Sequence, residues 1–161
     1  MTTYTLHEQK ILILDFGSQY TQNIARKIRE CQVYCEIHPC TLPFDEIKAF
    51  NAKGIILSGG PASVLEKDAL LCDQRLFELE VPILGICYGM QLITHMLGGK
   101  VAPSAHREFG RAELILKEFS HLFEEVKNNS IVWMSHGDRI SKLPNGFKGI
   151  AFTDNSPMSA I

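Results

Sequence analysis

The chain has 161 residues, a formal net charge of -2, 45% hydrophobic residues and 21% charged residues, which suits one globular domain with a substantial core. The slightly negative charge argues against a general electrostatic binder of nucleic acid. No apolar run reaches the length of a membrane span, and the polar segment 1–10 lacks the apolar core of a signal peptide. We therefore expect a cytoplasmic protein with no nucleic-acid partner and no membrane partner.

Over the first hundred residues, apolar strand patterns alternate with helical patterns. The expected strands cover residues 11–14, 33–38, 54–58 and 82–86, and the expected helices cover 19–30, 45–50, 70–80 and 88–97. This alternation predicts an α/β fold, an open, doubly wound, mostly parallel sheet with flanking helices. Ligands of such sheets bind beyond the carboxyl ends of the strands, where Asp15, Gly59-Gly60 and Cys87 all fall.

After Gly98-Gly99 the pattern changes to shorter strands. These are expected at residues 100–102, 112–116, 131–134 and 149–153, with a polar loop at 106–111 and a turn after residue 134. The chain ends in an apolar segment without a polar tail, which we interpret as a cut inside a domain.

Cys87 stands between the strand 82–86 and the helix that follows, with Gly85 and Gly89 on either side. A nucleophile between two glycines at a strand-to-helix turn is typical of a nucleophile elbow. The positive end of the helix dipole would favour the thiolate, which is the reactive form of the side chain. The alternative is a structural cysteine that behaves as a small hydrophobic residue.

Gly59 and Gly60 directly follow the strand 54–58. Their backbone amides could point at an anion, although a plain tight turn would account for the same residues. The segment is neither a Walker loop nor a dinucleotide fingerprint, because the required Gly and Lys spacings are missing.

The remaining cysteines have no role that the sequence reveals. The chain has five cysteines in all, and an odd number without a signal peptide argues against a disulfide framework. Three of them lie near His38, but their spacing fits no familiar zinc pattern, so we expect no metal site. The three cysteines near His38 are Cys31, Cys35 and Cys40, and the fourth cysteine without an assigned role is Cys72.

Five motifs resemble class I glutamine amidotransferases and, within that family, the N-terminal glutaminase domain of GMP synthetases. The resemblance covers nearly the whole chain in the right order, so residues 1–161 are expected to form a single, partial amidotransferase domain with a flavodoxin-like fold. The motifs are Ile-Leu-Asp-Phe-Gly-Ser-Gln-Tyr (13–20), Leu-Ser-Gly-Gly-Pro (57–61), Gly-Ile-Cys-Tyr-Gly-Met-Gln (85–91), Arg-Glu-Phe-Gly (107–110) and Trp-Met-Ser-His-Gly-Asp (133–138).

The resemblance implies that Cys87 attacks the side-chain amide of L-glutamine, releases ammonia and forms a glutamyl thioester that water hydrolyses. It assigns the oxyanion hole to the amides of Gly60 and Tyr88, with Gly59 adjacent. It places Gln91 and the Ser135-His136 backbone at the amino-acid end of the substrate. The domain itself is expected to need no cofactor.

The resemblance also implies a partner that is absent from this chain. In the family, ammonia passes to an ATP-pyrophosphatase (synthetase) domain, in the same chain or in a separate subunit, that uses ATP and Mg to convert XMP to GMP. A homodimer formed through the missing part is expected as well.

The general base of the family does not match any residue here. That base is a His followed two residues later by a Glu, and no His-x-Glu occurs after Asp138, so the base is expected beyond Ile161. His95 lies about two helical turns after Cys87 and could not reach its sulfur. His136 fits a substrate-side or structural role better than that of the base, and Glu108 and Asp138 could orient a base but have no obvious partner.

The chain alone is therefore expected to have little glutaminase activity. A non-catalytic module that binds glutamine or a partner is the alternative. The glutaminases of anthranilate and carbamoyl-phosphate synthetases share the cysteine elbow, but the segment 133–138 argues against them.

Overall fold

The computed structural model describes residues 9–118 and 120–161, with the side chains of 105–109, 135 and 136 left out. The chain forms two compact units, one running to Ile93 and the other from Thr94 to Ile161. In the described part, no helix is both long and apolar enough to span a bilayer.

The first unit contains a parallel sheet with the strand order β2-β1-β3-β4. This order matches the flavodoxin-like arrangement, so the predicted α/β class and parallel sheet are confirmed. The strands are β1 (Lys10–Asp15), β2 (Tyr34–Pro39), β3 (Gly54–Leu57) and β4 (Ile83–Gly85).

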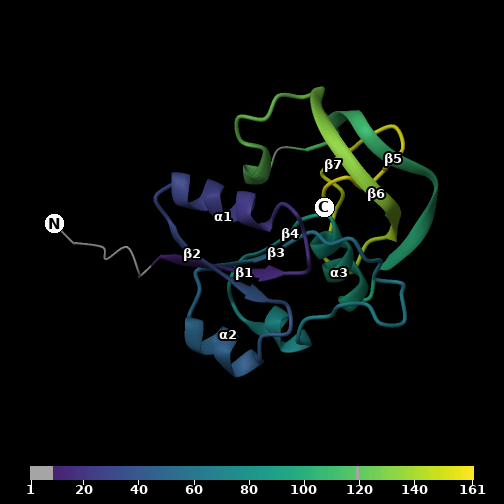
Figure 1. Cartoon of the computed structure of the whole chain (residues 1–161). Coiled ribbons are helices and arrows are strands. Elements are labelled where there is room, and N and C mark those ends of the chain that lie inside the picture. Colours follow the sequence, from purple (N-terminus) through teal and green to yellow (C-terminus); the bar gives the residue numbers. More distant parts are fainter. Residues whose placement is uncertain (1–8, 119) are drawn as a thin grey trace. The chain divides into compact units, whose positions relative to one another are not determined.

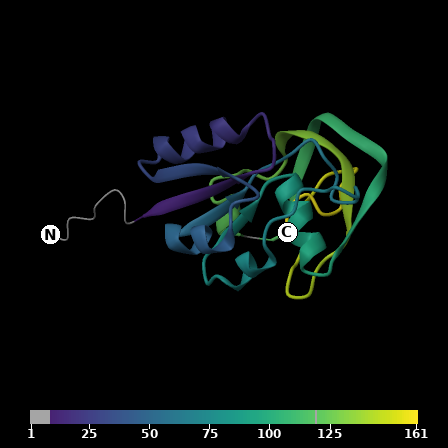
Figure 2. The same cartoon turned by 60° about the horizontal axis from the view of Figure 1, so that its bottom comes forward.

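Two helices cover opposite faces of this sheet, as Figure 1 and Figure 2 show from two directions. Helix α1 (Thr21–Glu30) packs its buried Ala25 against Ile13 of β1 and Cys35 of β2. Helix α2 (Phe44–Phe50) lies on the other face and buries Ile47. Leu12, Ile13 and Leu14 are fully buried, as expected for a central strand of a sheet covered on both faces.

The predicted helix 70–80 is wrong in extent, because only a 3-10 helix, η1 (Gln74–Glu78), forms there. Leu76 is its buried residue, whereas Leu70 and Leu71 are 41% and 49% exposed. A longer helix would gain little from packing, because the start of this segment buries no apolar stripe.

Helix α3 (Tyr88–Met96) follows β4 and includes residues on both sides of the boundary between the units. Its first turn approaches the end of β3, where the Gly89 amide donates to the Ser58 carbonyl at 3.1 Å. A Cβ on Gly89 would lie 2.3 Å from the Leu57 carbonyl oxygen, and one on Gly85 would lie 2.6 Å from the Gly89 backbone. Only glycine permits this approach.

The second unit contains the antiparallel strands β5 (Lys100–Leu116), β6 (Ser130–Lys142) and β7 (Ala151–Phe152), and a 3-10 helix, η2 (His121–Phe123). The predicted polar loop 106–111 and the predicted turn after residue 134 are wrong, because both segments are paired in the β5–β6 ladder, for example at Gly110 and Met134. Polar residues are compatible with an antiparallel strand that has one face in water, so polarity alone led to the wrong prediction.

We predict that Gly89→Ala lowers the free energy of unfolding, although alanine is normally the better helix former. The added methyl group has to displace the Leu57 carbonyl, which should cost about 1–3 kcal/mol or more. Urea denaturation followed by circular dichroism measures the change. The control is Gly149→Ala, where a Cβ meets no atom within 4 Å, so its effect should stay within about 0.5 kcal/mol. Equal stability of the two variants would contradict the close approach.

Candidate functional site

Cys87 lies at the sharp turn between β4 and α3 and is exposed to solvent. Its φ angle is 51°, in the left-handed region that residues with a Cβ rarely adopt. The amides of Met90 and Gln91 donate to the Cys87 carbonyl at 3.0 and 3.1 Å and begin the helix. This is the strained, accessible geometry of a nucleophile elbow, and strain of this kind is frequent at functional sites.

The carboxyl ends of β1 and β3 are joined by a network of hydrogen bonds around Asp15. One carboxylate oxygen, Asp15 Oδ1, accepts from Thr21 Oγ1 at 2.7 Å and from the Gly17 amide at 3.0 Å. Ser58 Oγ lies 3.4 Å from the same oxygen and accepts from the Phe16 amide at 3.0 Å. Thr21 and Ser58 are buried. Ser58 is the member of this network that directly precedes the Gly59-Gly60 turn and contacts it, with its Oγ 2.8 Å from the Gly59 carbonyl oxygen.

The Gly59-Gly60 turn lies beside the elbow. A Cβ built on Gly59 would be 3.6 Å from the Cβ of Cys87, and one on Gly60 would be 2.5 Å from the Phe16 carbonyl oxygen. Within the part of the chain that the structure describes, the amides of Gly60 and Tyr88 donate no backbone hydrogen bond outside helices and strands. Backbone N–H groups that are left unbonded at a helix start can bind an anion or a developing oxyanion.

The thiol of Cys87 is less acidic than the helix start alone would suggest. Although the residue is exposed, protein atoms packed around the thiol reduce its solvation and raise the pKa of Cys87 above its usual range. Desolvation is the cause of this shift, and it opposes the effect of the helix dipole. The thiol is therefore mainly protonated at neutral pH, and a nucleophilic reaction requires a base that takes the proton.

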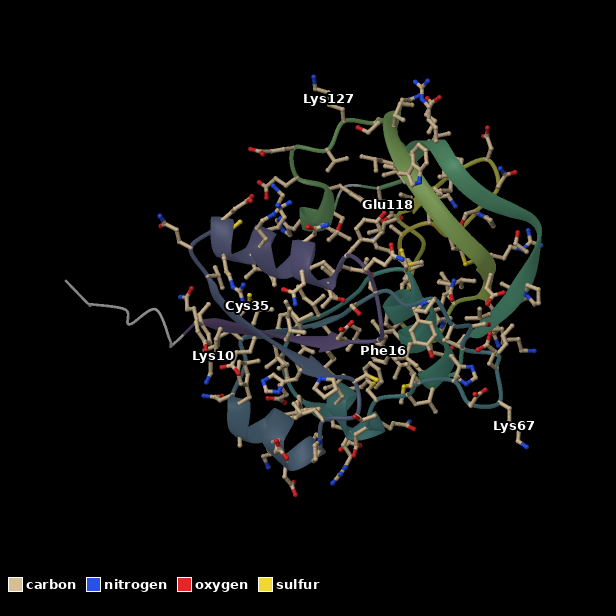
Figure 3. All side chains as sticks on the ribbon, in the orientation of Figure 1. Lys10, Phe16, Cys35, Lys67, Glu118 and Lys127 are labelled. Atoms are coloured by element: carbon tan, nitrogen blue, oxygen red, sulfur yellow. The ribbon has the colours of Figure 1, made fainter. Side chains whose placement is uncertain are left out.

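Tyr88, the residue after the nucleophile, anchors the start of α3. Its ring is buried, with its centroid 5.4 Å from that of Phe16, and its hydroxyl donates to the Leu70 carbonyl at 2.7 Å. Burial raises the pKa of Tyr88, so the phenol stays neutral at physiological pH. Figure 3 labels Phe16 at the carboxyl end of β1. The packing of these two rings holds the backbone amide of Tyr88 at the turn.

The other predicted site residues are placed as follows. Gln91 is buried in the first turn of α3. Ser135 and His136 belong to β6, opposite Phe109 and Glu108 of β5 in register, and their side chains lie outside the described residues, as does that of Glu108. His95 is exposed near the end of α3, and Asp138 lies in β6. Their predicted roles stay predictions.

The cysteines near His38 are spread over different environments. Cys35 and Cys40 are buried, whereas Cys31 is exposed. Cys35 Sγ lies 3.5 Å from the Ala25 carbonyl, between β2 and α1 (Figure 3). His38 Nε2 is 2.9 Å from a carboxylate oxygen of Glu36. Among the side chains that the structure describes, which leave out those of 105–109, 135 and 136, no three His, Cys, Asp or Glu residues gather as metal ligands would.

The sequence interpretation missed the polar residues below the Gly59-Gly60 turn. Ser58 was counted as the end of a strand, and Thr21 was not singled out. A usable signal was available for Ser58, because a hydroxyl residue between an apolar strand and two glycines can hydrogen-bond to the backbone of the turn.

Comparisons with known proteins place this geometry in a family. The family model that matches residues 12–161 is described as glutamine amidotransferase class-I. The GMP synthase [glutamine-hydrolyzing] of Wolinella succinogenes is 56% identical over 161 residues, covering 97% of this chain and 31% of the relative. The enzyme of the same name from Bacillus subtilis is 52% identical over 156 residues, covering 97% of this chain and 30% of the relative. The chain thus spans about a third of the length of these relatives.

Solved structures agree with the sequence relatives. A Thermoplasma acidophilum protein, described as one of the subunits of a GMP synthase, superimposes with a TM-score of 0.83 at 29% identity, over 93% of this chain and 75% of that chain. A glutamine amidotransferase of Thermotoga maritima superimposes with a TM-score of 0.73 over 93% of this chain and 69% of that chain, and its 19% identity shows the fold alone. The family resemblance inferred from the motifs is confirmed, and the chain belongs to the class I glutamine amidotransferases.

Proposed function

We propose that this chain is the glutaminase portion of a GMP synthetase and that Cys87 is its nucleophile. The observation that carries the proposal is the backbone of Cys87, which is held at a φ of 51° at an exposed turn. Left-handed geometry at a cysteine costs conformational energy and has no evident structural purpose here. It presents the thiol in front of the Gly59-Gly60 turn and the start of α3.

The proposed reaction is an acyl transfer through the Cys87 sulfur. The thiolate attacks the side-chain carbonyl carbon of glutamine, and a C–S bond forms while the carbonyl oxygen gains negative charge. The amides of Gly60 and Tyr88 donate hydrogen bonds to this oxygen. The C–N bond then breaks, the nitrogen takes a proton and leaves as ammonia, and water hydrolyses the remaining thioester to glutamate.

Substrate-binding residues and a partner domain complete the proposal. Gln91 and the backbone of Ser135 and His136 hold the amino-acid end of the substrate, as the family resemblance suggests. Ammonia is supplied to a synthetase domain that uses ATP and Mg to aminate XMP to GMP, in an assembly that is a homodimer. The relatives named GMP synthase [glutamine-hydrolyzing] support this context.

The raised pKa of Cys87 favours a second candidate. A protonated thiol without a base would bind glutamine, or a partner protein, without hydrolysing its amide. In this alternative the domain is a non-catalytic binding module. The two candidates differ in whether a form of the protein that carries the family's His-x-Glu base turns over glutamine.

We predict that the longest form of the protein encoded by its gene hydrolyses glutamine and that Cys87→Ala abolishes this activity. Loss of the nucleophile removes the covalent route altogether, so a fall of roughly 10⁴-fold or more is expected. The 161-residue chain should be nearly inactive, since the expected base is not in it. Coupled detection of glutamate measures the rate.

The matched control for this experiment is Cys31→Ala, which removes an exposed cysteine at the end of α1 and should leave the rate unchanged. If the long form with Cys87 intact does not hydrolyse glutamine, the enzymatic proposal fails and the binding module is favoured. If Cys87→Ala hydrolyses glutamine as fast as its parent, Cys87 is not the nucleophile.

We also predict the pH dependence of Cys87 alkylation in the 161-residue chain. Only the thiolate reacts with iodoacetamide, so a raised pKa lowers the reactive fraction at neutral pH. The rate should rise with pH, with a midpoint above about 8.5, the ordinary cysteine value. Peptide-resolved mass spectrometry follows Cys87 separately from the other thiols. A midpoint below the ordinary value would mean that the helix dipole outweighs desolvation.

A further inference from the structure

The Ser58 hydroxyl lies beneath the peptide that joins Gly59 to Gly60. Ser58 directly follows β3 and is fully buried. Its own amide donates to the Leu14 carbonyl at 3.0 Å, and its Oγ accepts from the Phe16 amide at 3.0 Å. Ser58 is therefore held at the end of β1 by two hydrogen bonds, one through its backbone amide and one through its side-chain oxygen.

The hydroxyl has one proton and two possible acceptors. The Gly59 carbonyl oxygen lies 2.8 Å from Ser58 Oγ, whereas Asp15 Oδ1 lies 3.4 Å away. Asp15 Oδ1 already accepts from Thr21 Oγ1 and from the Gly17 amide. The shorter distance to an acceptor with fewer donors assigns the proton to the Gly59 carbonyl.

A fixed Gly59 carbonyl also fixes the amide of Gly60. The described part of the chain contains no cis peptide bond, and in a trans peptide the C=O and the N–H point in opposite directions. Gly60 has to be glycine for steric reasons, since a Cβ there would lie 2.5 Å from the Phe16 carbonyl oxygen. Glycine peptides reorient easily, so this peptide needs an anchor outside itself.

We infer that Ser58 is a positioning residue of the glutaminase, whose hydroxyl holds the Gly59 carbonyl and thereby keeps the Gly60 amide oriented toward the developing oxyanion. The inference rests on the proposed function, because the Gly60 amide is one of the two oxyanion donors in that proposal. Ser58 does not touch the substrate. It acts through the Gly59-Gly60 peptide.

The test is Ser58→Ala in the longest form that the gene encodes. The kcat of glutamine hydrolysis should fall roughly 10- to 100-fold, somewhat less than the loss typical of a deleted oxyanion donor. KM should change by less than about twofold, because the donor acts on the tetrahedral state and not on bound glutamine. Alkylation of Cys87 by iodoacetamide should keep its rate, since displacement at a saturated carbon builds no oxyanion.

The matched control is Thr21→Val. It removes a second buried hydroxyl, the one that donates to Asp15 Oδ1, with little change in side-chain volume. Its kcat should stay within about threefold of the parent, because it leaves the Ser58–Gly59 hydrogen bond in place. If Thr21→Val loses as much activity as Ser58→Ala, or if Ser58→Ala slows alkylation as much as hydrolysis, the role of Ser58 is structural and the inference is overturned.

A second measurement tests the hydrogen bond itself in the 161-residue chain. The amide nitrogen of Gly60 senses hydrogen bonding at the preceding carbonyl, so Ser58→Ala should shift its ¹⁵N resonance in a glycine-labelled sample. An unmoved Gly60 resonance would overturn the inference. If the long form hydrolyses glutamine through Cys87 and Ser58→Ala has the same kcat as its parent, this inference alone is overturned. A long form that does not hydrolyse glutamine overturns the proposed function as well.

Discussion

The close approach of the first turn of α3 to the end of β3 is the contact on which the candidate site depends. Gly89 can donate to the Ser58 carbonyl only because no side chain separates the two backbones. That contact holds the helix start against the Gly59-Gly60 turn and leaves Cys87 in a left-handed conformation. The strain at Cys87 costs on the order of 1–3 kcal/mol. The packing of Tyr88 on Phe16 and the buried network around Asp15 offset it.

Desolvation and the helix dipole act on the same thiol with opposite signs. The helix start favours the thiolate by a modest amount when exposed, whereas crowding by protein atoms raises the pKa of Cys87. A neutral resting thiol is protected from adventitious oxidation and alkylation, because thiolates react far faster than thiols. Such a cysteine becomes nucleophilic when a base and a substrate arrive together. If Cys87 is the nucleophile, as we propose, its reactivity depends on a base that accepts the thiol proton.

The sequence was informative where residue identity is dictated by backbone geometry. The parallel strands β1 to β4 and the elbow at Cys87 were predicted, because apolar runs and paired glycines are compatible with few local structures. The long β5–β6 ladder was not predicted, since the segment 106–111 is polar and its strand conformation comes from pairing with a distant segment. Ser58 was overlooked for a related reason, because a hydrogen bond to the next residue's carbonyl leaves no periodic pattern.

The oxyanion hole proposed for this protein consists of backbone amides, so no side chain in the sequence can report it directly. What the sequence does record is the set of residues that shape the backbone. Glycine is required where chains approach closely, and we infer that the Ser58 hydroxyl supplies the hydrogen bond that stops the Gly59-Gly60 peptide from reorienting. A flexible peptide would have to be ordered during the reaction, whereas one that is held in advance avoids this reorganisation cost. In this proposed arrangement Ser58 matters as much as the glycines. Glycine allows the peptide to adopt the required orientation but also allows others, and the hydrogen bond from Ser58 favours one of them.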